Sequence, residues 1–419
     1  MATALNGNTR EFRLFLEDLC CDLCRFSHVA YDGCSPEGVR IDREIYLGVR
    51  DVFADIRVSA PGRAPYFVEV NFGYGDDEIL RSLRRKFGTE APLLAEASKI
   101  IVLFDQAGRQ DRQKFEDEMA ERLRPGLMLE VWDENILFSL LSKQFGVRVD
   151  SITEDRLLEL RTAVDVAKAT YAFGGDPDDY FKDPIRAALL WHFSFWRLRE
   201  LIEWNRAAPR DILQPSVYRR VVVLMADLCS FSSYVRDTRE DEIIRQSLTA
   251  FYSKARHQII NNGGMMYQFA GDLVIGFFGI PDHKRNYVQQ ALETAKSLID
   301  IGNSVSNQWQ RRIDRIQTSG GVHISLAMGD LQIVSLRPLS RIHMGAVGDA
   351  INMGSRLMHV ADSCEIVASN AFYQELGDAT KESFTEMKAL EARNIGRIRA
   401  WKLTVHHGYH DHGTASEEA

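Results

Sequence analysis

The chain has 419 residues, of which 45% are hydrophobic and 26% charged, with a formal net charge of −8. This length predicts two or three domains, and the composition excludes a disordered or fibrous chain. The acidic balance argues against stable nucleic-acid binding, and no apolar run reaches the roughly 18–20 residues of a membrane span. With no signal-peptide pattern at the N-terminus, we expect a cytoplasmic protein without a membrane partner.

Residues 1–148 alternate strand-like and helical patterns, which predicts an α/β domain. A helix is expected over residues 9–28. Cys20, Cys24 and His28 would share one face of it, so a metal site is an alternative to buried thiols there. The remaining strands and helices of this domain are expected at 46–60, 66–74, 76–88, 99–105, 112–124 and 127–133.

Residues 149–216 predict a helical linker that ends in the proline-containing segment 206–220. A second domain follows at 217–408, and residues 409–419 have the composition of a disordered tail. The patterns in the second domain alternate between strand and helix. Its elements are expected at 221–226, 240–262, 265–270, 273–279, 286–308 and 320–329, before a strand, a loop and a helix.

Two aspartates of the second domain follow apolar runs. Asp227 ends the run VVVLMA, and Asp272 occupies the turn of the hairpin MMYQFAGDLVIGFF. If the two strands pair, both carboxylates converge and can hold two divalent cations. The alternative is that each aspartate is an ordinary turn residue. Small residues after Asp227 leave backbone amides free for phosphate.

The segment GDAINMGSR carries Asn352 and Arg356, four residues apart in a helix-forming stretch. Such residues project from one face of a helix. An asparagine can bond a ribose oxygen, and an arginine can stabilise charge on a phosphate during its transfer. The alternative is a solvated polar face.

The motifs MADLCSFS, GGMMYQFAGD and GDAINMGSR, in this order, resemble the class III nucleotidyl cyclase catalytic domain. The resemblance implies a ferredoxin-like βαββαβ core and an α+β chain. It also implies two Mg²⁺ or Mn²⁺ ions and a homodimer whose active sites are shared between protomers. By resemblance, the ions are held by Asp227, Asp272 and the Leu228 carbonyl, Asn352 and Arg356 are catalytic, and phosphate is bound by Phe231, Ser232 and Arg397.

The base-recognition positions of the family fall at Gln268 and Gly345, where adenine-specific members have Lys with Asp or Thr, and guanine-specific members have Glu and Cys. Gln268 both donates and accepts hydrogen bonds, which fits a uracil or cytosine edge. In this the chain resembles the pyrimidine cyclases of bacterial Pycsar anti-phage systems. The resemblance implies UTP or CTP as substrate, with UTP favoured, and a separate effector protein that responds to the cyclic product. A purine cyclase and a catalytically degenerate regulatory protein are the alternatives.

The order of elements in residues 1–148 resembles a restriction-endonuclease-like core. Asp55 and Glu69 match its acidic positions, but Asn71 replaces the lysine that active members need. Arg84, Arg85 and Lys86 on the following helix are candidate substitutes. We expect an inactive sensor or dimerisation domain, with a nuclease as the alternative.

Overall fold

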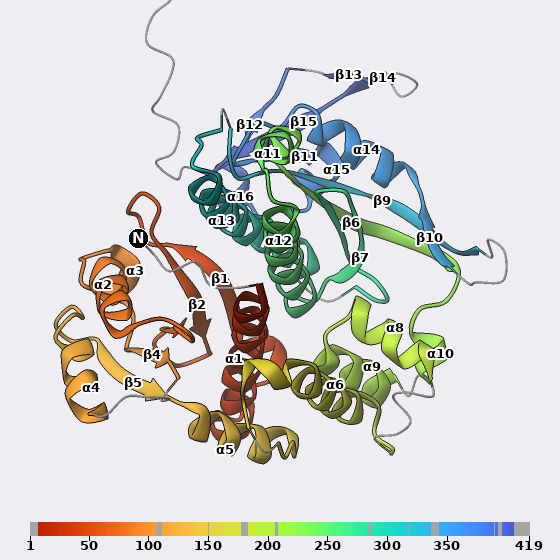
Figure 1. Cartoon of the computed structure of the whole chain (residues 1–419). Coiled ribbons are helices and arrows are strands. Elements are labelled where there is room, and N and C mark those ends of the chain that lie inside the picture. The colour runs from red at the N-terminus through yellow and green to blue at the C-terminus, as the bar shows by residue number, and fades with distance from the viewer. Residues whose placement is uncertain are drawn as a thin grey trace, which may run out of the picture. The chain divides into compact units, whose positions relative to one another are not determined.

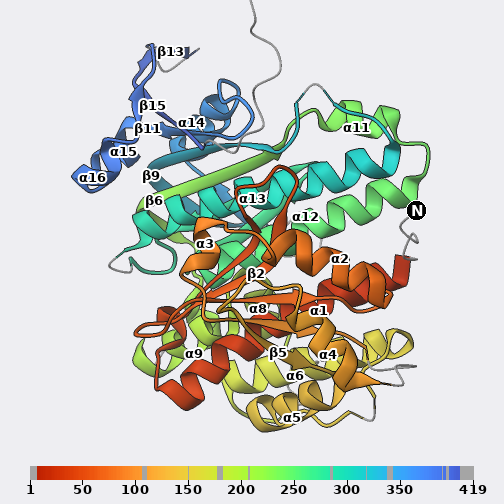
Figure 2. The ribbon, with the colours of Figure 1, turned by 90° about the vertical axis from the view of Figure 1, so that its left-hand side faces the viewer.

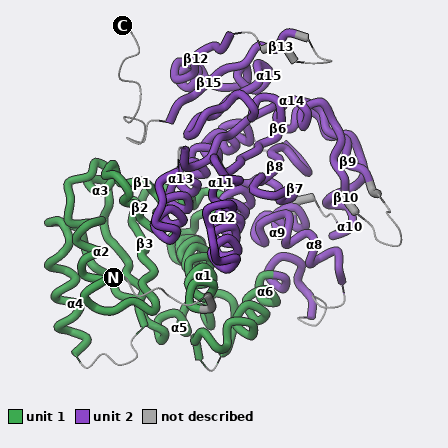
Figure 3. The backbone as a smooth tube through the Cα atoms, turned by 45° about the horizontal axis from the view of Figure 1, so that its top comes forward, with its two compact units in different colours: residues 1–168, 407–419 green, residues 169–406 purple. Residues whose placement is uncertain are grey.

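The structure is a computed structural model (Figure 1). The chain forms two compact units, which comprise residues 1–168 with 407–419 and residues 169–406 (Figure 3). The division falls inside helix α6 (Leu157–Phe173), within the expected helical linker. The tail expected at 409–419 lies outside the described residues. The structure describes residues 7–105, 111–149, 151–176, 183–205, 208–283, 286–317, 319–336, 343–388, 390–392 and 396–405.

Unit 1 contains a five-stranded sheet in the order β1-β2-β3-β4-β5, antiparallel from β1 to β3 and parallel from β3 to β5. One apolar core joins the sheet to α1, α5 and α6, and a second joins it to α2 and α4. The sheet is therefore covered on both faces. Its elements are α1 (Gly7–Asp32), β1 (Arg40–Tyr46), β2 (Phe53–Ser59), β3 (Tyr66–Val70), α2 (Asp76–Phe87), α3 (Pro92–Ala95), β4 (Lys99–Leu103), α4 (Arg112–Ala120), β5 (Met128–Trp132) and α5 (Glu134–Phe145), with one-turn 3₁₀ helices at Pro36–Gly38 and Glu154–Arg156.

The expectation of a strand over 46–60 is wrong in its first half. The chain turns at 47–52, and β2 pairs with a strand that was not predicted, β1. β1 contains four charged residues among seven, which hides its strand character. Arg43 is fully buried there because Glu17 and Asp18 of α1 pair with its guanidinium.

The thiols of α1 at positions 20, 21 and 24 are free and buried. This agrees with the expectation of buried thiols on this helix.

Unit 2 contains an eight-stranded sheet in the order β12-β15-β11-β9-β6-β8-β7, with β10 paired to β9. The connections β6–α12–β7–β8–α13–β9 and the antiparallel order β9-β6-β8-β7 confirm the predicted βαββαβ arrangement. Its central elements are β6 (Ser216–Leu228), α11 (Phe231–Asp237), α12 (Asp241–Asn261), β7 (Met265–Ala270), β8 (Leu273–Phe278), α13 (Tyr287–Ile313) and β9 (Val322–Leu336).

Helices cover both faces of this sheet. The main core lies between the sheet and α12 and α13, whereas α14 packs on the opposite face over β6 and β9 (Figure 2). The face with α14 carries the candidate site described below. The C-terminal elements are β10 (His343–Val347), α14 (Asp349–Met358), β11 (Glu365–Ser369), α15 (Asn370–Gln374), α16 (Asp378–Lys381), β12 (Thr385–Glu386), β15 (Ala400–Thr404) and a separate hairpin of β13 (Leu390–Ala392) and β14 (Gly396–Ile398).

The segment before β6 is helical as predicted, with α8 (Pro184–His192), α9 (Phe195–Asn205) and the short α10 (Pro209–Ile212). The interpretation of 206–220 as a linker is wrong at its end, since β6 begins at Ser216. A register shift between Tyr218 and Val221 interrupts the pairing of β6 with β9, and Arg220 has a positive φ there. Among the described helices, none combines the length and the hydropathy of a membrane span.

Candidate active site

Asp227 and Asp272 come together at one end of the unit 2 sheet. Ala226 of β6 pairs with Val274 of β8, so the next residue of β6 and the hairpin turn before β8 reach the same edge. Gly271 allows this tight turn because its φ is +67°. Burial, together with the negative charge of Asp227, raises the pKa of Asp272 to about 7. The predicted convergence of the two carboxylates is therefore present.

His323 is a member of this site that the sequence did not reveal. It lies opposite Asp227 in the β6–β9 pairing, and its Nε2 is 3.3 Å from Oδ2 of Asp227. Its Nδ1 lies 3.3 Å from Sγ of Cys229. Burial by itself would lower the pKa of His323, but the bonds to Asp227 and Cys229 outweigh burial and raise this pKa to about 10. The imidazolium thus balances one of the two carboxylates at neutral pH.

Helix α14 approaches the sheet closely because small residues face it. A Cβ on Gly354 would lie 3.3 Å from the Met225 sulfur, and one on Gly348 would lie 2.5 Å from a backbone oxygen. The helix holds Asn352, which is exposed, and Arg356, which is half-buried. Nη1 of Arg356 is buried and has no hydrogen-bond partner among the described residues. A guanidinium in this state is suited to bind an anion.

The predicted phosphate-binding residues lie on two different elements. Phe231 and Ser232 begin α11 after a residue with positive φ, Ser230. Leu228, whose carbonyl is predicted as a metal ligand and not as a phosphate contact, ends β6 and is buried. Arg397 lies elsewhere, on β14 of the separate hairpin, and its side chain is exposed. Among the described residues, no contact connects Arg397 with either aspartate. Its assignment to phosphate stays a prediction.

The two predicted base-recognition residues lie on β7 and β10 of the same chain. Gln268 is half-buried on β7, and Gly345 is buried on β10. The two strands are not neighbours in the sheet, yet Ala346 N–H donates to the hydroxyl of Tyr267 at 3.0 Å. Tyr267 precedes Gln268, and Ala346 follows Gly345. The bond therefore joins the chain neighbours of the two predicted residues.

The residues at the sheet edge fit a magnesium or manganese site. The described part of the chain contains no group of three or more His, Cys, Asp or Glu side chains arranged for a metal. Mg²⁺ does not need one, since it is bound by one or two carboxylates together with water and phosphate oxygens. A carboxyl that holds its proton to about pH 7 beside a second carboxylate is a group from which a divalent cation can displace a proton.

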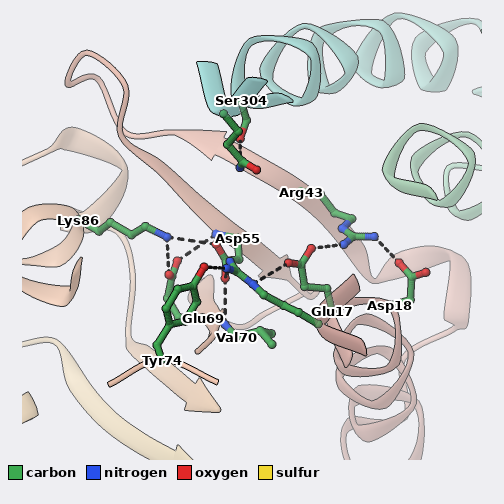
Figure 4. Close-up of polar contacts among 11 residues, drawn as sticks. Glu17, Asp18, Arg43, Asp55, Glu69, Val70, Tyr74, Lys86 and Ser304 are labelled. Atoms are coloured by element: carbon green, nitrogen blue, oxygen red, sulfur yellow. Dashed lines mark hydrogen bonds and ion pairs between the residues drawn. The ribbon is translucent and has the colours of Figure 1, made fainter. Parts of the chain in front are cut away.

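Unit 1 contains a second cluster of buried charges, formed by Asp55 of β2, Glu69 of β3 and Lys86 of α2 (Figure 4). Nζ of Lys86 lies 2.5 Å from Glu69 and 3.1 Å from Asp55. The amides of Asp55 and Val70 each donate to the other strand's carboxylate at 2.9 Å. Burial and the charge of Asp55 raise the pKa of Glu69 to about 7. Of the three cations considered on α2, Lys86 is the one that reaches both acids.

Comparison with known proteins gives solved structures only, since no family model and no curated protein matches. The chain is similar to the catalytic core of a rhodopsin-guanylyl cyclase with converted specificity in complex with ATPαS, at 20% identity over 45% of this chain and 97% of that chain, with a TM-score of 0.37. It is similar to the guanylyl cyclase Cya2 at 19% identity, 46% and 98% coverage and a TM-score of 0.39. It is also similar to the adenylyl cyclase CyaB from P. aeruginosa, at 16% identity over 46% of this chain and 97% of that chain, with a TM-score of 0.38.

Proposed function

We propose that unit 2 converts a nucleoside triphosphate into its 3′,5′-cyclic monophosphate and pyrophosphate. The observation that carries the proposal is the convergence of Asp227 and Asp272, with the pKa of Asp272 raised to about 7 by burial and by its neighbour. Such a pair at the end of a sheet has a strong affinity for divalent cations. The order of the three cyclase-like motifs along this sheet supports the same reaction.

Two Mg²⁺ or Mn²⁺ ions held by the aspartates and by the Leu228 carbonyl would neutralise the triphosphate and lower the pKa of the ribose 3′-hydroxyl. In the reaction, the 3′-oxygen forms a bond to the α-phosphorus and the bond to pyrophosphate breaks. Arg356 binds the charge that develops on the α-phosphate, for which its unpartnered Nη1 is available. Asn352 orients the ribose. In a homodimer, these two residues act on the substrate held by the aspartates of the partner protomer.

The substrate is proposed to be a pyrimidine nucleoside triphosphate, UTP before CTP. Gln268 can donate to and accept from the Watson–Crick edge of uracil, whereas Gly345 offers only its backbone. A site that lacks a charged group for a purine edge has no strong means of selecting adenine or guanine. A cyclic pyrimidine nucleotide would act as a second messenger for a separate effector protein in anti-phage defence. A purine cyclase is the alternative within the same reaction.

Incubation of the full chain with ATP, GTP, CTP and UTP in Mg²⁺ or Mn²⁺, followed by mass identification of the products, tests this function. We expect cyclic UMP as the main product, and its loss by at least a hundredfold in Asp227→Asn and Asp272→Asn. Asp378→Asn, a change at an exposed acid of α16, is the matched control. Cyclic AMP as the main product would refute the pyrimidine substrate. Full turnover in either aspartate variant would refute the site.

A second candidate function belongs to unit 1, and the position of Lys86 favours it. Its ammonium contacts Asp55 and Glu69 and so supplies the cation that Asn71 does not. Two acids and a lysine at this spacing can hold a cation and orient water for phosphodiester hydrolysis. The test is cleavage of plasmid DNA in Mg²⁺. Nicking that persists in Asp227→Asn and disappears in Asp55→Asn would support a nuclease, and intact DNA would exclude it under these conditions.

A further inference from the structure

The turn that carries Asp272 has few neighbours of its own. β7 is the last strand in the order of the described sheet, so β8 is its one neighbouring strand there. The two residues between β7 and β8 are Gly271, which is exposed, and Asp272, which is half-buried. A Cβ on Gly271 would meet nothing within 4 Å. Contacts from other elements therefore decide how firmly the Asp272 carboxylate is held.

Tyr252 of α12 supplies such a contact. Its hydroxyl donates a hydrogen bond to the carbonyl oxygen of Gly271. Its ring stacks on Phe269 of β7, with ring centroids 4.1 Å apart and an angle of 13° between the ring planes. Burial, and then the charge of Asp272, raise the pKa of Tyr252, so this carboxylate lies within electrostatic reach of the phenol. One side chain thus contacts both the strand before the turn and the turn itself.

The bond to Gly271 acts on Asp272 through a single peptide group. The Gly271 carbonyl and the Asp272 amide belong to the same planar unit, so an orientation imposed on one is imposed on the other. The Asp272 amide in turn forms a hydrogen bond with the carboxylate of its own side chain. A fixed peptide plane therefore restricts the directions in which this carboxylate can point.

The stacked partner Phe269 is itself held by α8, since both α8 and α12 contact β7 (Figure 1). The rings of Trp191 and Phe269 meet edge to face, with centroids 5.8 Å apart at 84°. Nε of Arg256 donates to the Trp191 carbonyl at 3.0 Å, and its guanidinium lies 4.9 Å from the centre of the indole ring. Tyr252 and Arg256 are four residues apart and so lie on one face of α12. This face contacts β7 both directly and through α8.

We infer that Tyr252 is a positioning residue for the metal site: it holds the Gly271–Asp272 peptide so that the Asp272 carboxylate stays within reach of an ion bound to Asp227. The inference rests on the divalent-cation site of the proposed function and adds a residue that is not a ligand. Mg²⁺ requires near-octahedral geometry with ligands at about 2.0–2.1 Å, so a carboxylate that is not held in place must be ordered when the ion binds. Loss of the Tyr252 hydroxyl therefore weakens metal binding.

The test is the Mn²⁺ dissociation constant of the full chain, measured by titration calorimetry, and the binding step that Asp227→Asn abolishes identifies the site. Tyr252→Phe keeps the stack on Phe269 and removes only the hydroxyl. We expect the dissociation constant to rise about fivefold, because the net contribution of one hydrogen bond corresponds to a factor of about two to ten. Tyr373→Phe, a change in another tyrosine that stacks on a ring, that of Trp401, is the matched control and should alter the constant by less than about twofold.

Urea unfolding of the metal-free chain separates positioning from a purely structural role. A structural role would lower the unfolding midpoint of Tyr252→Phe and leave the Mn²⁺ affinity of the folded chain unchanged, and that result would overturn the inference. An equal loss of affinity in Tyr373→Phe would overturn it too.

The proposed function can fail separately from this inference. If wild type binds Mn²⁺ and forms no cyclic nucleotide, the proposed reaction fails, and the Mn²⁺ constants still decide the role of Tyr252. If cyclic nucleotide forms and the constant of Tyr252→Phe equals that of wild type, the inference alone is refuted. A wild-type chain that binds no Mn²⁺ would overturn both.

Discussion

Lys86→Met tests how the buried acids of unit 1 are stabilised. The substitution keeps most of the volume and removes the charge that lies 2.5 Å from Glu69 and 3.1 Å from Asp55. Both carboxylate side chains are at most 5% exposed, so water cannot replace the lysine. Removal of one partner from a buried pair costs about 3–5 kcal/mol. Because Arg13 still lies 3.3 Å from Asp55, we expect a loss of about 2–4 kcal/mol in the free energy of unfolding at pH 8.

The pH dependence of this loss follows from Glu69. Burial and Asp55 already raise its pKa from 4.5 to about 7 in the folded state, and removal of Lys86 raises it further. A carboxyl with a raised folded pKa stabilises the fold below its unfolded pKa and loses that stabilisation as the pH rises through the folded value. At pH 5 the variant therefore holds Glu69 protonated, and we expect less than about half of the loss seen at pH 8.

Hydrogen exchange of the β3 amides in urea is the appropriate assay, because the two units need not unfold together. Arg84→Met, a change of an exposed cation on the same helix, is the control and should alter stability by less than about 0.5 kcal/mol. A loss below about 1 kcal/mol in Lys86→Met at pH 8, or an equal loss at pH 5 and pH 8, would refute this reasoning.

Three further predictions concern unit 2. His323→Gln removes a positive charge 3.3 Å from Asp227, so Mn²⁺ should bind about tenfold more tightly at pH 7 by titration calorimetry, and unchanged affinity would contradict this. Asp227→Asn should lower the pKa of Asp272 below about 7 in a carbon-13 NMR titration, but not to its ordinary value, because burial, the larger cause of the shift, remains; a pKa that stays at about 7 would assign the whole shift to burial. Gly354→Val inserts methyl groups where a Cβ already lies 3.3 Å from the Met225 sulfur; we expect about 1–3 kcal/mol of destabilisation by urea unfolding, and full stability would show that α14 packs less closely.

Those parts of the fold with regular apolar periodicity could be predicted from the sequence. The hairpin was placed at 265–270 and 273–279 and is found at 265–270 and 273–278. β1 was missed because its charged residues are buried through pairs with a distant helix, and no local pattern reveals such partners. The start of β6 at Ser216 was missed for a different reason: its first five residues are exposed or only partly buried, so they lack the apolar pattern of the rest of the strand.

The candidate site, like the fold, could be predicted from the sequence only in part. Asp227 and Asp272 were found because each carries an unexpected charge next to an apolar run. His323 was missed because a histidine inside a strand gives no such signal, and its role depends on the β6–β9 register, which only the fold determines. A β-bulge at Tyr267, where the register of β7 shifts against β8, likewise gave no signal in the sequence. Sequence spacing therefore locates reactive groups along the chain, but strand register decides which of them meet.

The two acid pairs of the chain differ in how their charge is balanced. In unit 1, Lys86 pairs with both carboxylates, and Arg13 adds a contact to Asp55, so the chain supplies its own cations. In unit 2, His323 pairs with Asp227, and among the described residues no cation forms an ion pair with Asp272. An acid that lacks an internal partner gains most from an added divalent ion. As Mn²⁺ is raised, unit 2 should therefore be occupied before unit 1, where a metal would first have to displace Lys86 from the acids.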